Sequence, residues 1–335
     1  MNTSKDIWIA CGGSGGHFMP GLVCGRQLTE KGFEVKYWGE GKKIEVSLCQ
    51  SHQVKMHRPI GGGGRLKRAV ILSFKLFFSA LKKKPSLCIM CGGFTSYFMA
   101  KIARLFSIPY VILEQNTIPG KVNQSISKHS KVNFMTFPGS EKFMQSECIL
   151  SGNPVRCVDV EKQKEIDVLI IGGSQGALYL NEKLATLIEG SLKIVLICGP
   201  GHLEVSKIAW QQTNHQIEIL EESSDIPSLA NKSKWVFTRA GATSLSELAG
   251  IGAAVIAIPY TEAAENHQYL NAVYLEENNA AVMLQESEFE LKKEQINLLL
   301  SQDNQYLKYG ENLKNTPIAD INGEKTISYL IEKVL

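Results

Sequence analysis

Short apolar runs alternate along the first half of the chain with stretches in which apolar residues recur at helical spacing. Continuous apolar runs of this kind are typical of buried parallel strands. The predicted strands are residues 7–11, 34–38, 54–57, 87–91, 110–113, 132–136 and 148–150, and the predicted helices are residues 20–31, 43–51, 65–84 and 95–106. This alternation predicts an α/β domain whose parallel sheet carries helices on both faces.

The same pattern restarts after a polar, charged segment at residues 151–164. Strands are predicted at residues 168–171, 193–198, 217–220, 235–238, 254–258 and 281–284, with helices between them and a helical tail from Glu286 onward. We therefore expect two Rossmann-like domains, residues 1–157 and 158–335, with parallel sheets facing across a cleft. The last helix is expected to pack back on the first domain.

Each half contains a glycine-rich loop directly after its first strand. The first reads GGSGGH and ends at His17, and the second reads GGSQGA and ends at Ala177. Strand, glycine loop and helix together form a unit that places free helix amides near a phosphate. A single loop of this kind also fits a structural turn, but its repetition favours two nucleotide-binding-type halves.

Composition and charge limit the class of protein. The chain has 335 residues with 44% apolar and 21% charged residues, and a net charge of +3. These values are ordinary for a soluble globular protein and provide no case for nucleic-acid binding. No signal peptide is expected, since Asp6 and the glycine loop interrupt the first apolar run, and no run approaches the roughly 20 apolar residues of a membrane span.

The eight cysteines predict neither a metal site nor a disulfide framework. Several lie inside apolar strands, as expected of reduced, buried thiols. Cys88 and Cys91 form a C-x-x-C on a predicted strand, where this spacing places them on opposite faces. We interpret them as structural residues.

The segment 65–84 contains seven basic residues and no acidic one. On a helical wheel, Leu66, Val70, Phe74, Phe77 and Leu81 share one face, with Arg68, Lys75, Ser79 and Lys82 opposite and Ile71, Leu72, Leu76 and Phe78 flanking the basic stripe. A core helix with solvated lysines explains part of this pattern. A basic amphipathic helix that docks on an anionic membrane surface explains the rest. The predicted membrane residues are Arg65, Lys67, Arg68, Phe74, Lys75, Phe77, Phe78, Lys82, Lys83 and Lys84.

Polar residues follow several predicted strands, at the sheet edge where ligands bind in this architecture. Glu114 and Asn116 follow one strand, where they either bind a ligand or cap the next helix. Arg156 ends the sequence GNPVR, and its guanidinium suits a pyrophosphate. Glu247 lies in a helix that opens with small residues, and it either binds ribose hydroxyls or favours the helix dipole.

Two further positions fit sugar or acid–base chemistry. His267, Gln268 and Asn271 follow the strand at 254–258, and such side chains suit sugar hydroxyls, although polar helix-surface residues are equally consistent. His17 adjoins the first glycine loop, where a histidine orients a substrate or acts as a base if it is not simply a packing residue.

Taken together, the segments GGSGGH, GGFTS, EQN, GNPVR, GGSQGA, RAGATSLSE and HQYLNA resemble the MurG family. These N-acetylglucosaminyltransferases complete the disaccharide of bacterial lipid II. The motifs keep the family's order from about residue 7 to residue 272. The resemblance implies a GT-B-type fold and transfer of GlcNAc from UDP-GlcNAc to the 4-hydroxyl of MurNAc in lipid I, with inversion.

The resemblance also implies roles for individual residues. His17 and Glu114 are the expected catalytic or acceptor-side residues. Glu247 would bind the ribose, and Asn116 and Gln268 would bind the GlcNAc. Ser14 stands where the family often has threonine. Ser223 stands at the position that contacts the uracil, which in the family usually lies beside an isoleucine. The full set of expected UDP-GlcNAc contacts is Ser14, Gly15, Gly16, Asn116, Arg156, Ser174, Gln175, Gly176, Ser223, Ala242, Thr243, Ser244, Leu245, Ser246, Glu247 and Gln268.

The expected partners follow from this reaction. They are UDP-GlcNAc as donor, lipid I as acceptor and the cytoplasmic face of an anionic bacterial membrane, to which the protein binds peripherally. Other cell-wall synthesis proteins are left open, and nucleic acid is not expected. No metal or tightly bound cofactor is needed, because loop amides and Arg156 are suited to the charge on the leaving UDP.

Three alternatives remain open at this point. A nicotinamide dehydrogenase also uses a glycine loop and an acidic residue after the second strand; Glu40 is near that place, but GGSGGH lacks the usual spacing. A GT-B transferase with a different lipid acceptor is a closer alternative. A non-catalytic, nucleotide-binding membrane scaffold is the third.

Overall fold

The computed structural model describes residues 5–58, 64–156, 163–173, 176–223, 225–261, 266–302 and 304–335, apart from the side chains of residues 65 and 66. The chain forms two compact units. Unit 1 comprises Met1–Arg156 together with Pro317–Leu335, and unit 2 comprises Cys157–Thr316. The predicted α/β class with parallel sheets is confirmed, and each unit is treated by itself below.

Unit 1 is built on a sheet whose seven described strands run parallel in the order β3-β2-β1-β4-β5-β6-β7. The central strands are apolar and fully buried, because helices cover both sheet faces. The strands are β1 (Asp6–Ala10), β2 (Glu34–Trp38), β3 (Met56–His57), β4 (Leu87–Met90), β5 (Tyr110–Glu114), β6 (Asn133–Met135) and β7 (Cys148–Leu150).

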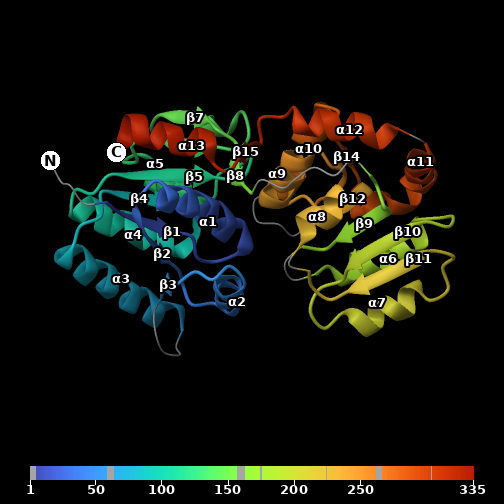
Figure 1. The fold of residues 1–335 in the computed structure, drawn as a ribbon, viewed down its shortest axis with the longest axis horizontal. Helices are drawn as coiled ribbons and strands as arrows, with labels where there is room; N and C mark the ends of the chain where they lie inside the picture. The colour runs from blue at the N-terminus through green and yellow to red at the C-terminus, as the bar shows by residue number, and fades with distance from the viewer. Residues whose placement is uncertain are drawn as a thin grey trace. The chain divides into compact units, whose positions relative to one another are not determined.

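Two helical layers enclose this sheet (Figure 1). The core on one face is formed with α1 (Gly15–Glu30), α2 (Lys43–Ser51) and the C-terminal helices. The core on the other face is formed with α3 (Arg65–Lys82), α4 (Gly93–Leu105) and α5 (Lys121–Ser127). A short 3₁₀ helix, η1 (Ser140–Phe143), precedes β7.

Helix α1 begins five residues earlier than predicted. Proline at 20 suggested a helix start, but the backbone amides of His17 and Phe18 already contact the carbonyl of Ser14, so the first turn forms from Gly15 onward. Pro20 lies inside the helix. The correction has a consequence for the site: Gly15, Gly16 and His17 form the first turn, where helix amides lack internal partners.

The end of the chain returns to unit 1 as a strand and a helix. The predicted uninterrupted helical tail is wrong here, because β15 (Ala319–Ile321) pairs in parallel with β8 (Asn153–Val155). Helix α13 (Glu324–Tyr329) continues into η4 (Leu330–Val334), red beside β7 in Figure 1. Ile327 and Leu330 are buried in the same core as α1, and the Tyr329 hydroxyl lies 3.0 Å from the Glu147 carboxylate.

A buried carboxylate paired with two lysines stabilises the amino end of β1, opposite the end that leads into the glycine loop. The side chain of Asp6 is fully buried, and Nζ of Lys36 and Nζ of Lys83 each lie 2.7 Å from its carboxylate oxygens. Burial alone would raise the pKa of Asp6, but hydrogen bonds with the carboxyl of Glu34 and with both lysines lower it to about 2. The ionised form is therefore the one that the fold stabilises.

This arrangement predicts loss of stability in acid. Because the folded pKa of Asp6 lies below the unfolded value near 4, its contribution of about 2 kcal/mol is present above that value and is lost as pH falls toward 2. In denaturant titrations, Asp6→Asn should lower the free energy of unfolding at neutral pH and flatten its decline between about pH 5 and 2. Asp225→Asn, at an exposed position in unit 2, is the control. An Asp6→Asn profile parallel to wild type would contradict the assignment.

Unit 2 repeats the architecture with six described parallel strands in the order β11-β10-β9-β12-β13-β14. The predicted strands are all present, with ends shifted by at most two residues. They are β9 (Ile166–Ile171), β10 (Lys193–Ile197), β11 (Gln216–Leu220), β12 (Ser233–Arg239), β13 (Ala254–Ile258) and β14 (Ala281–Met283).

Helices and two buried tryptophans complete the core of unit 2. Trp210 and Trp235 pack among the buried strand residues, and Nε1 of Trp210 donates to the carbonyl of Asn181 at 2.7 Å. The helices are α6 (Leu178–Leu187), α7 (Leu203–Trp210), α8 (Ile226–Asn231), α9 (Ala242–Ile251), α10 (His267–Glu277), η3 (Glu286–Glu288), α11 (Phe289–Ser301) and α12 (Gln305–Lys314).

Candidate functional site

Both sheets contain a topological switch point, where the chain connections from two neighbouring strands lead to opposite sides of the sheet. In unit 1 it lies between β1 and β4, and in unit 2 between β9 and β12. Ligands of open parallel sheets bind outside the carboxyl ends of the strands at this point. Both predicted glycine loops directly follow a strand that borders a switch point.

His17 lies at the switch point of unit 1. A Cβ built on Gly92 would be only 2.9 Å from Nε2 of the His17 ring, so the ring rests directly on the start of α4. Gly92 has φ +105°, a conformation that glycine adopts without strain. The first turns of α1 and α4 therefore meet at the His17 ring, and both helix ends favour negative charge there.

A cavity of about 500 Å³ opens beside this histidine. Its walls combine the glycine loop with charged residues from neighbouring elements. The lining residues are Gly13, Ser14, His17, Glu40, Lys42, Arg68, Gly93 and Phe94. Ser14 and His17 are residues that the sequence predicts for the site, and Arg68 was expected on the membrane surface. Glu40 and Lys42 were not assigned to the site. The position of these two residues just after β2, the strand beside β1, was the available signal.

Glu45 connects the two loops that border the cavity. Its buried carboxylate accepts hydrogen bonds from the backbone amide of Gly13 and from that of Gly41, each at 2.7 Å. One oxygen holds the glycine loop after β1, and the other holds the loop after β2. Lys42 is positioned on the same rim, with Nζ 3.1 Å from Glu40 and 3.5 Å from the carbonyl of Gly13.

Glu45→Gln tests whether this connection shapes the site. Glutamine has one oxygen for two donors, so its NH₂ group would face a backbone N–H, at a cost of about 1–3 kcal/mol. We expect a lower melting temperature and a higher KM for any substrate that binds in this cavity. Glu30→Gln, an exposed change at the end of α1, is the matched control. Unchanged stability and unchanged KM in Glu45→Gln would rule out the connecting role.

Glu114, an expected catalytic residue, is held within its own loop. The carboxylate is buried and accepts hydrogen bonds from the backbone amides of Asn116 (2.9 Å) and Gly120 (3.1 Å) and from the side-chain amides of Asn116 (3.4 Å) and Asn123 (2.7 Å). Burial raises the pKa of Glu114, against the effect of these donors. The geometry indicates a carboxylate that organises the loop after β5. Asn116 is half-exposed in that loop.

Arg156 follows β8 in unit 1. Its side chain is half-exposed. The pKa of His52 is lowered mainly by desolvation of the His52 ring and further by the positive charge of Arg156. Within the described residues, its buried Nε has no hydrogen-bond partner. The segment directly before Arg156 is the strand β8, whose pairing with β15 fixes the direction of the backbone that presents the guanidinium.

In unit 2, the second glycine loop lies against the carboxyl end of β10. A Cβ on Gly176 would be 2.4 Å from the carbonyl oxygen of Cys198, which only glycine avoids. The Gly176 amide donates to the carbonyl of Gly173 at 3.0 Å. Ser174 and Gln175, two expected donor contacts, lie outside the described residues.

Helix α9 follows β12, the other strand that borders the switch point of unit 2. The predicted contacts in this helix fall into two groups that differ in exposure. Thr243, Ser244 and Glu247 are partly exposed. Ala242, Leu245 and Ser246 are buried, and the Ser246 hydroxyl donates to the Ala242 carbonyl at 2.9 Å. Only the first group has side chains that reach the surface.

The remaining expected contacts, to the uracil and to the sugar, follow β11 and β13. The side-chain oxygen of Gln268 accepts from the Tyr260 amide at 3.0 Å, and the Ser223 hydroxyl accepts from the Asp225 amide at 3.2 Å. Asn271 is fully buried, and its amide donates to the Ala240 carbonyl at 3.1 Å, which is a structural role.

Helix α3 exposes an apolar face. Leu72, Leu76 and Ala80 pack on the sheet, so the side of the helix next to the basic stripe is its buried face. The outward residues Val70, Phe74, Phe78 and Leu81 are 48–60% exposed. Among the helices of the described chain, none is long and apolar enough to cross a membrane.

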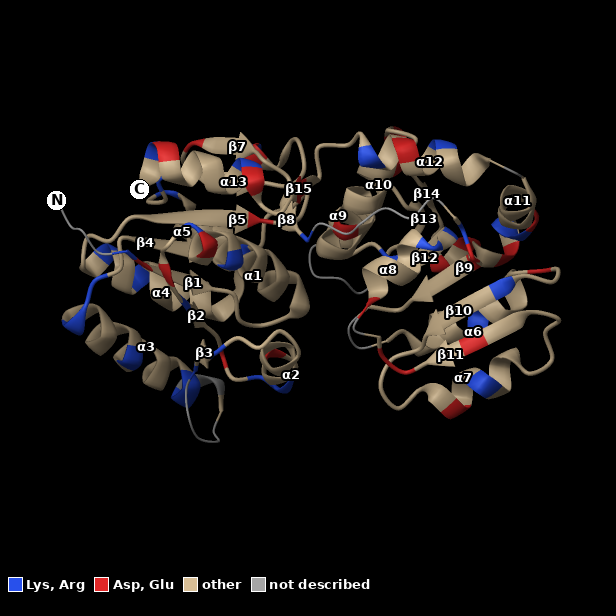
Figure 2. Ribbon diagram, in the orientation of Figure 1, with Lys and Arg blue, Asp and Glu red and all other residues tan. Residues whose placement is uncertain are grey.

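The basic residues of this segment have different environments (Figure 2). Lys67 and Lys82 are exposed, and the side chain of Arg65 lies outside the description. Lys75 donates to the carbonyl of Arg58 at 2.8 Å. Lys83 and Lys84 follow the end of α3, where Lys83 pairs with Asp6 and Glu34 and Lys84 donates to the Phe106 carbonyl at 3.3 Å. Phe77 is half-buried and packs edge-on against Phe106.

Within the described ranges, no group of three or more histidine, cysteine, aspartate or glutamate side chains is arranged to hold a metal ion. The described cysteines are free thiols, and burial raises the pKa of both Cys88 and Cys91. The site is therefore described by helix ends, glycine loops and a few cationic side chains.

Comparison with known proteins identifies the class and then the family. The glycosyltransferase family 28 N-terminal domain matches residues 7–134, and the C-terminal domain of the same family matches residues 167–324. The solved structure of MurG from Acinetobacter baumannii is similar to this chain with a TM-score of 0.80 and 25% identity, covering 98% of this chain and 99% of that one. The chain is thus a glycosyltransferase of the GT-B class.

Curated relatives narrow the assignment. The UDP-N-acetylglucosamine--N-acetylmuramyl-(pentapeptide) pyrophosphoryl-undecaprenol N-acetylglucosamine transferase of Psychromonas ingrahamii is 30% identical over all of both chains. The transferase of the same name from Alcanivorax borkumensis is 32% identical over 84% of this chain and 85% of its own. The chain belongs to this family of transferases, the MurG family.

Proposed function

We propose that this protein transfers GlcNAc from UDP-GlcNAc to the 4-hydroxyl of MurNAc in lipid I, with inversion, and so forms lipid II for peptidoglycan synthesis. The observation that carries the proposal is the full-length similarity to transferases named for this reaction. The two switch-point glycine loops agree with it, because a dehydrogenase has no use for the second.

Unit 1 provides the acceptor side in this proposal. The cavity beside His17 is lined by Arg68 and by the first turn of α1, which favour an anionic acceptor, whereas Lys42 is paired with Glu40. His17 receives the proton of the attacking hydroxyl, since an imidazole titrates near neutral pH. Glu114 orders the neighbouring loop rather than acting as the base.

The proposed donor contacts are divided between the units: Glu247, Gln268 and Ser223 belong to unit 2, and Ser14, Gly15, Gly16, Asn116 and Arg156 belong to unit 1. Glu247 binds the ribose, Gln268 and Asn116 bind the GlcNAc, and Ser223 lies at the uracil. Ser14, Gly15, Gly16, Arg156 and the amides of residues 174–176 take the diphosphate, together with the first turn of α9. Negative charge grows on the leaving UDP, and amides and a guanidinium placed beforehand stabilise it.

Membrane contact is the third part of the proposal. The exposed apolar face of α3, flanked by Lys67, Lys82 and Arg68, inserts into the headgroup boundary of an anionic membrane on its cytoplasmic side. The lipid tail of the acceptor stays in the bilayer while its sugar enters unit 1.

The experiment is UDP release from UDP-GlcNAc, measured with and without a soluble lipid I analogue. We expect release that depends on the acceptor, and equilibrium binding of UDP but not of NAD. Binding of UDP-GlcNAc without acceptor-dependent release would favour a different acceptor. Failure to bind UDP-GlcNAc would contradict the proposal, and NAD binding would favour the dehydrogenase.

A further inference from the structure

A charged cluster in unit 2 lies at the edge of the sheet where ligands of this architecture bind. It consists of Arg239, Tyr260 and Glu286, none of which is among the contacts expected from the sequence. Arg239 ends β12, Tyr260 comes two residues after the end of β13, and Glu286 begins η3 after β14. Because β12, β13 and β14 are neighbouring parallel strands, their carboxyl ends bring the three residues together.

The guanidinium of Arg239 holds two of these chain segments at once. Its Nη2 lies 2.6 Å from a carboxylate oxygen of Glu286, and its Nη1 donates to the carbonyl of Pro259 at 3.2 Å. Its Cζ lies 5.2 Å from the centre of the Tyr260 ring, which is a cation–π contact. One guanidinium can make these contacts together because its donors are fixed in a plane and the face of that plane remains for the ring.

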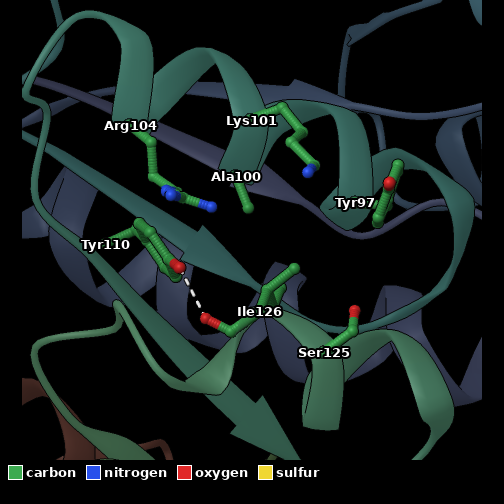
Figure 3. Close-up of a pocket in the computed structure, with 7 residues that line it drawn as sticks. All are labelled: Tyr97, Ala100, Lys101, Arg104, Tyr110, Ser125 and Ile126. Carbon is green, nitrogen blue, oxygen red and sulfur yellow. Dashed lines mark hydrogen bonds between the residues drawn. The ribbon is translucent and has the colours of Figure 1, made fainter.

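Burial indicates that Arg239 acts through its neighbours and not directly on a ligand. The residue is 9% exposed, and Glu286 balances its charge. Arg104 of unit 1 provides a contrast, because it lines a cavity of about 160 Å³ and its guanidinium extends over the hollow (Figure 3). Arg239 lines neither that cavity nor the one beside His17. The geometry is that of a residue that positions other groups.

The carboxylate of Glu286 is itself presented from a fixed turn. Gln285 and Glu288 form a capping box around this turn, in which the backbone amide of Gln285 donates to the Glu288 carboxylate at 3.0 Å. Nζ of Lys292 lies 3.0 Å from the same carboxylate. The side chain of Glu286 is 19% exposed, so the turn holds it against Arg239 and largely away from water.

The backbone of Tyr260 connects this cluster to an expected sugar contact. The amide of Tyr260 donates to Oε1 of Gln268 at 3.0 Å. This bond orients the side-chain amide of Gln268, since the oxygen faces Tyr260 and the nitrogen points away from it. The carbonyl that Arg239 holds belongs to Pro259, the residue directly before Tyr260. Arg239 therefore fixes the backbone that in turn orients Gln268.

A second contact ties α10 to the same strand end. Nδ2 of the buried Asn271 donates at 3.1 Å to the carbonyl of Ala240, the residue after Arg239. The end of β12 thus holds the backbone at Pro259 through Arg239 and holds α10 through Asn271. Helix α9, which carries Glu247, begins two residues after Ala240. The groups proposed for the GlcNAc and for the ribose are consequently anchored on one strand end.

We propose that Arg239, held by Glu286, positions Gln268 and so determines how well the protein recognises the sugar of the donor, as distinct from its UDP part. The inference rests on the proposed function, in which Gln268 binds the GlcNAc. Glu286 and Tyr260 are positioning residues in this scheme. Ser223, the proposed uracil contact, follows β11 at the opposite edge of the sheet, so UDP binding should depend little on the cluster.

The test compares equilibrium binding of UDP-GlcNAc and of UDP to the full chain by calorimetry. Glu286→Ala should weaken UDP-GlcNAc binding roughly fivefold to tenfold, as expected for one lost hydrogen bond, and should change UDP binding less than about twofold. Arg239→Lys should have the same effect, because lysine offers one nitrogen and no planar face. Glu290→Ala, which removes an exposed carboxylate from α11, is the matched control and should bind both ligands as wild type does.

A double variant tests whether the cluster acts through Gln268. In a protein that already carries Gln268→Ala, Glu286→Ala should weaken UDP-GlcNAc binding no further. Additive losses would overturn the route through Gln268. An equal loss of UDP and UDP-GlcNAc binding, or a lower melting temperature with an unchanged ratio of the two affinities, would reduce the cluster to a structural role and overturn the inference.

Failure of the proposed function would look different. A wild-type protein that binds UDP but not UDP-GlcNAc would contradict the proposed donor and this inference together. Wild-type binding of UDP-GlcNAc, with the same affinity ratio in Glu286→Ala and Arg239→Lys, would contradict the inference alone.

Discussion

His17→Ala is expected to lower kcat/KM for transfer by roughly 10² to 10⁴, the range typical of a lost general base. The ring lies where the first turns of α1 and α4 meet, and it lines the larger cavity of unit 1. No other histidine lines that cavity. The measurement is steady-state UDP release with a soluble lipid I analogue, with the melting temperature as the test of folding.

The way in which the loss divides between kcat and KM shows the role of His17. A base acts in the transition state, so kcat should carry most of the loss and KM should change little. His57→Ala is a suitable control, because His57 is an exposed residue on β3 whose ring stacks on Trp38. A folded His17→Ala protein with wild-type kcat would remove the histidine from the chemistry, and a change confined to KM would make it a positioning residue.

Leu330→Ala is expected to destabilise unit 1 by about 2–5 kcal/mol, although residue 330 is almost at the end of the chain. Leu330 is fully buried in the core shared with α1 and the central strands β1 and β4. Removing its side chain leaves a cavity that the rigid sheet cannot fill. Chemical unfolding followed by hydrogen exchange should show the loss in the amides of unit 1, with unit 2 unaffected.

The neighbouring residue provides the control. Ile331 is 38% exposed, so Ile331→Ala should change the free energy of unfolding by less than about 1 kcal/mol. If the two alanine variants were equally stable, or if Leu330→Ala weakened unit 2, the return of the C-terminal segment to unit 1 would be wrong.

Strands and most helices of this fold follow from local pattern. The helix at residues 43–51 and the strands at 34–38 and 254–258 have the predicted bounds. Apolar runs report buried strands because both faces of each sheet are covered. The strand β15 was missed because its three residues contain little apolar pattern, and it forms by pairing with β8, more than 160 positions earlier in the chain.

The helix start at Gly15 shows a limit of residue preferences. Proline favours the first turn of a helix and predicted a start at residue 20. In the structure, glycines that looked like a loop are part of the helix, because the Ser14 carbonyl accepts the first helical hydrogen bond. The helix amides consequently lie at the glycine motif itself, where the phosphate chemistry requires them.

Parts of the site that depend on distant contacts could not be predicted. The glycine loops and His17 were visible as motifs, but Glu45 is 32 residues from Gly13, and nothing in the sequence links them. The amphipathic character of α3 was also visible. Which apolar residues face the sheet was not, since the answer depends on how Leu72 and Leu76 fit the strands below.

The most direct measurement of the central claim is the structure of the product. Isotope-labelled UDP-GlcNAc is incubated with the protein and a lipid I analogue, and the linkage is determined by NMR. We expect labelled GlcNAc on the 4-hydroxyl of MurNAc, with the anomeric configuration opposite to that of the donor. Labelled GlcNAc with retained configuration, or no labelled disaccharide from a protein that binds both substrates, would contradict it.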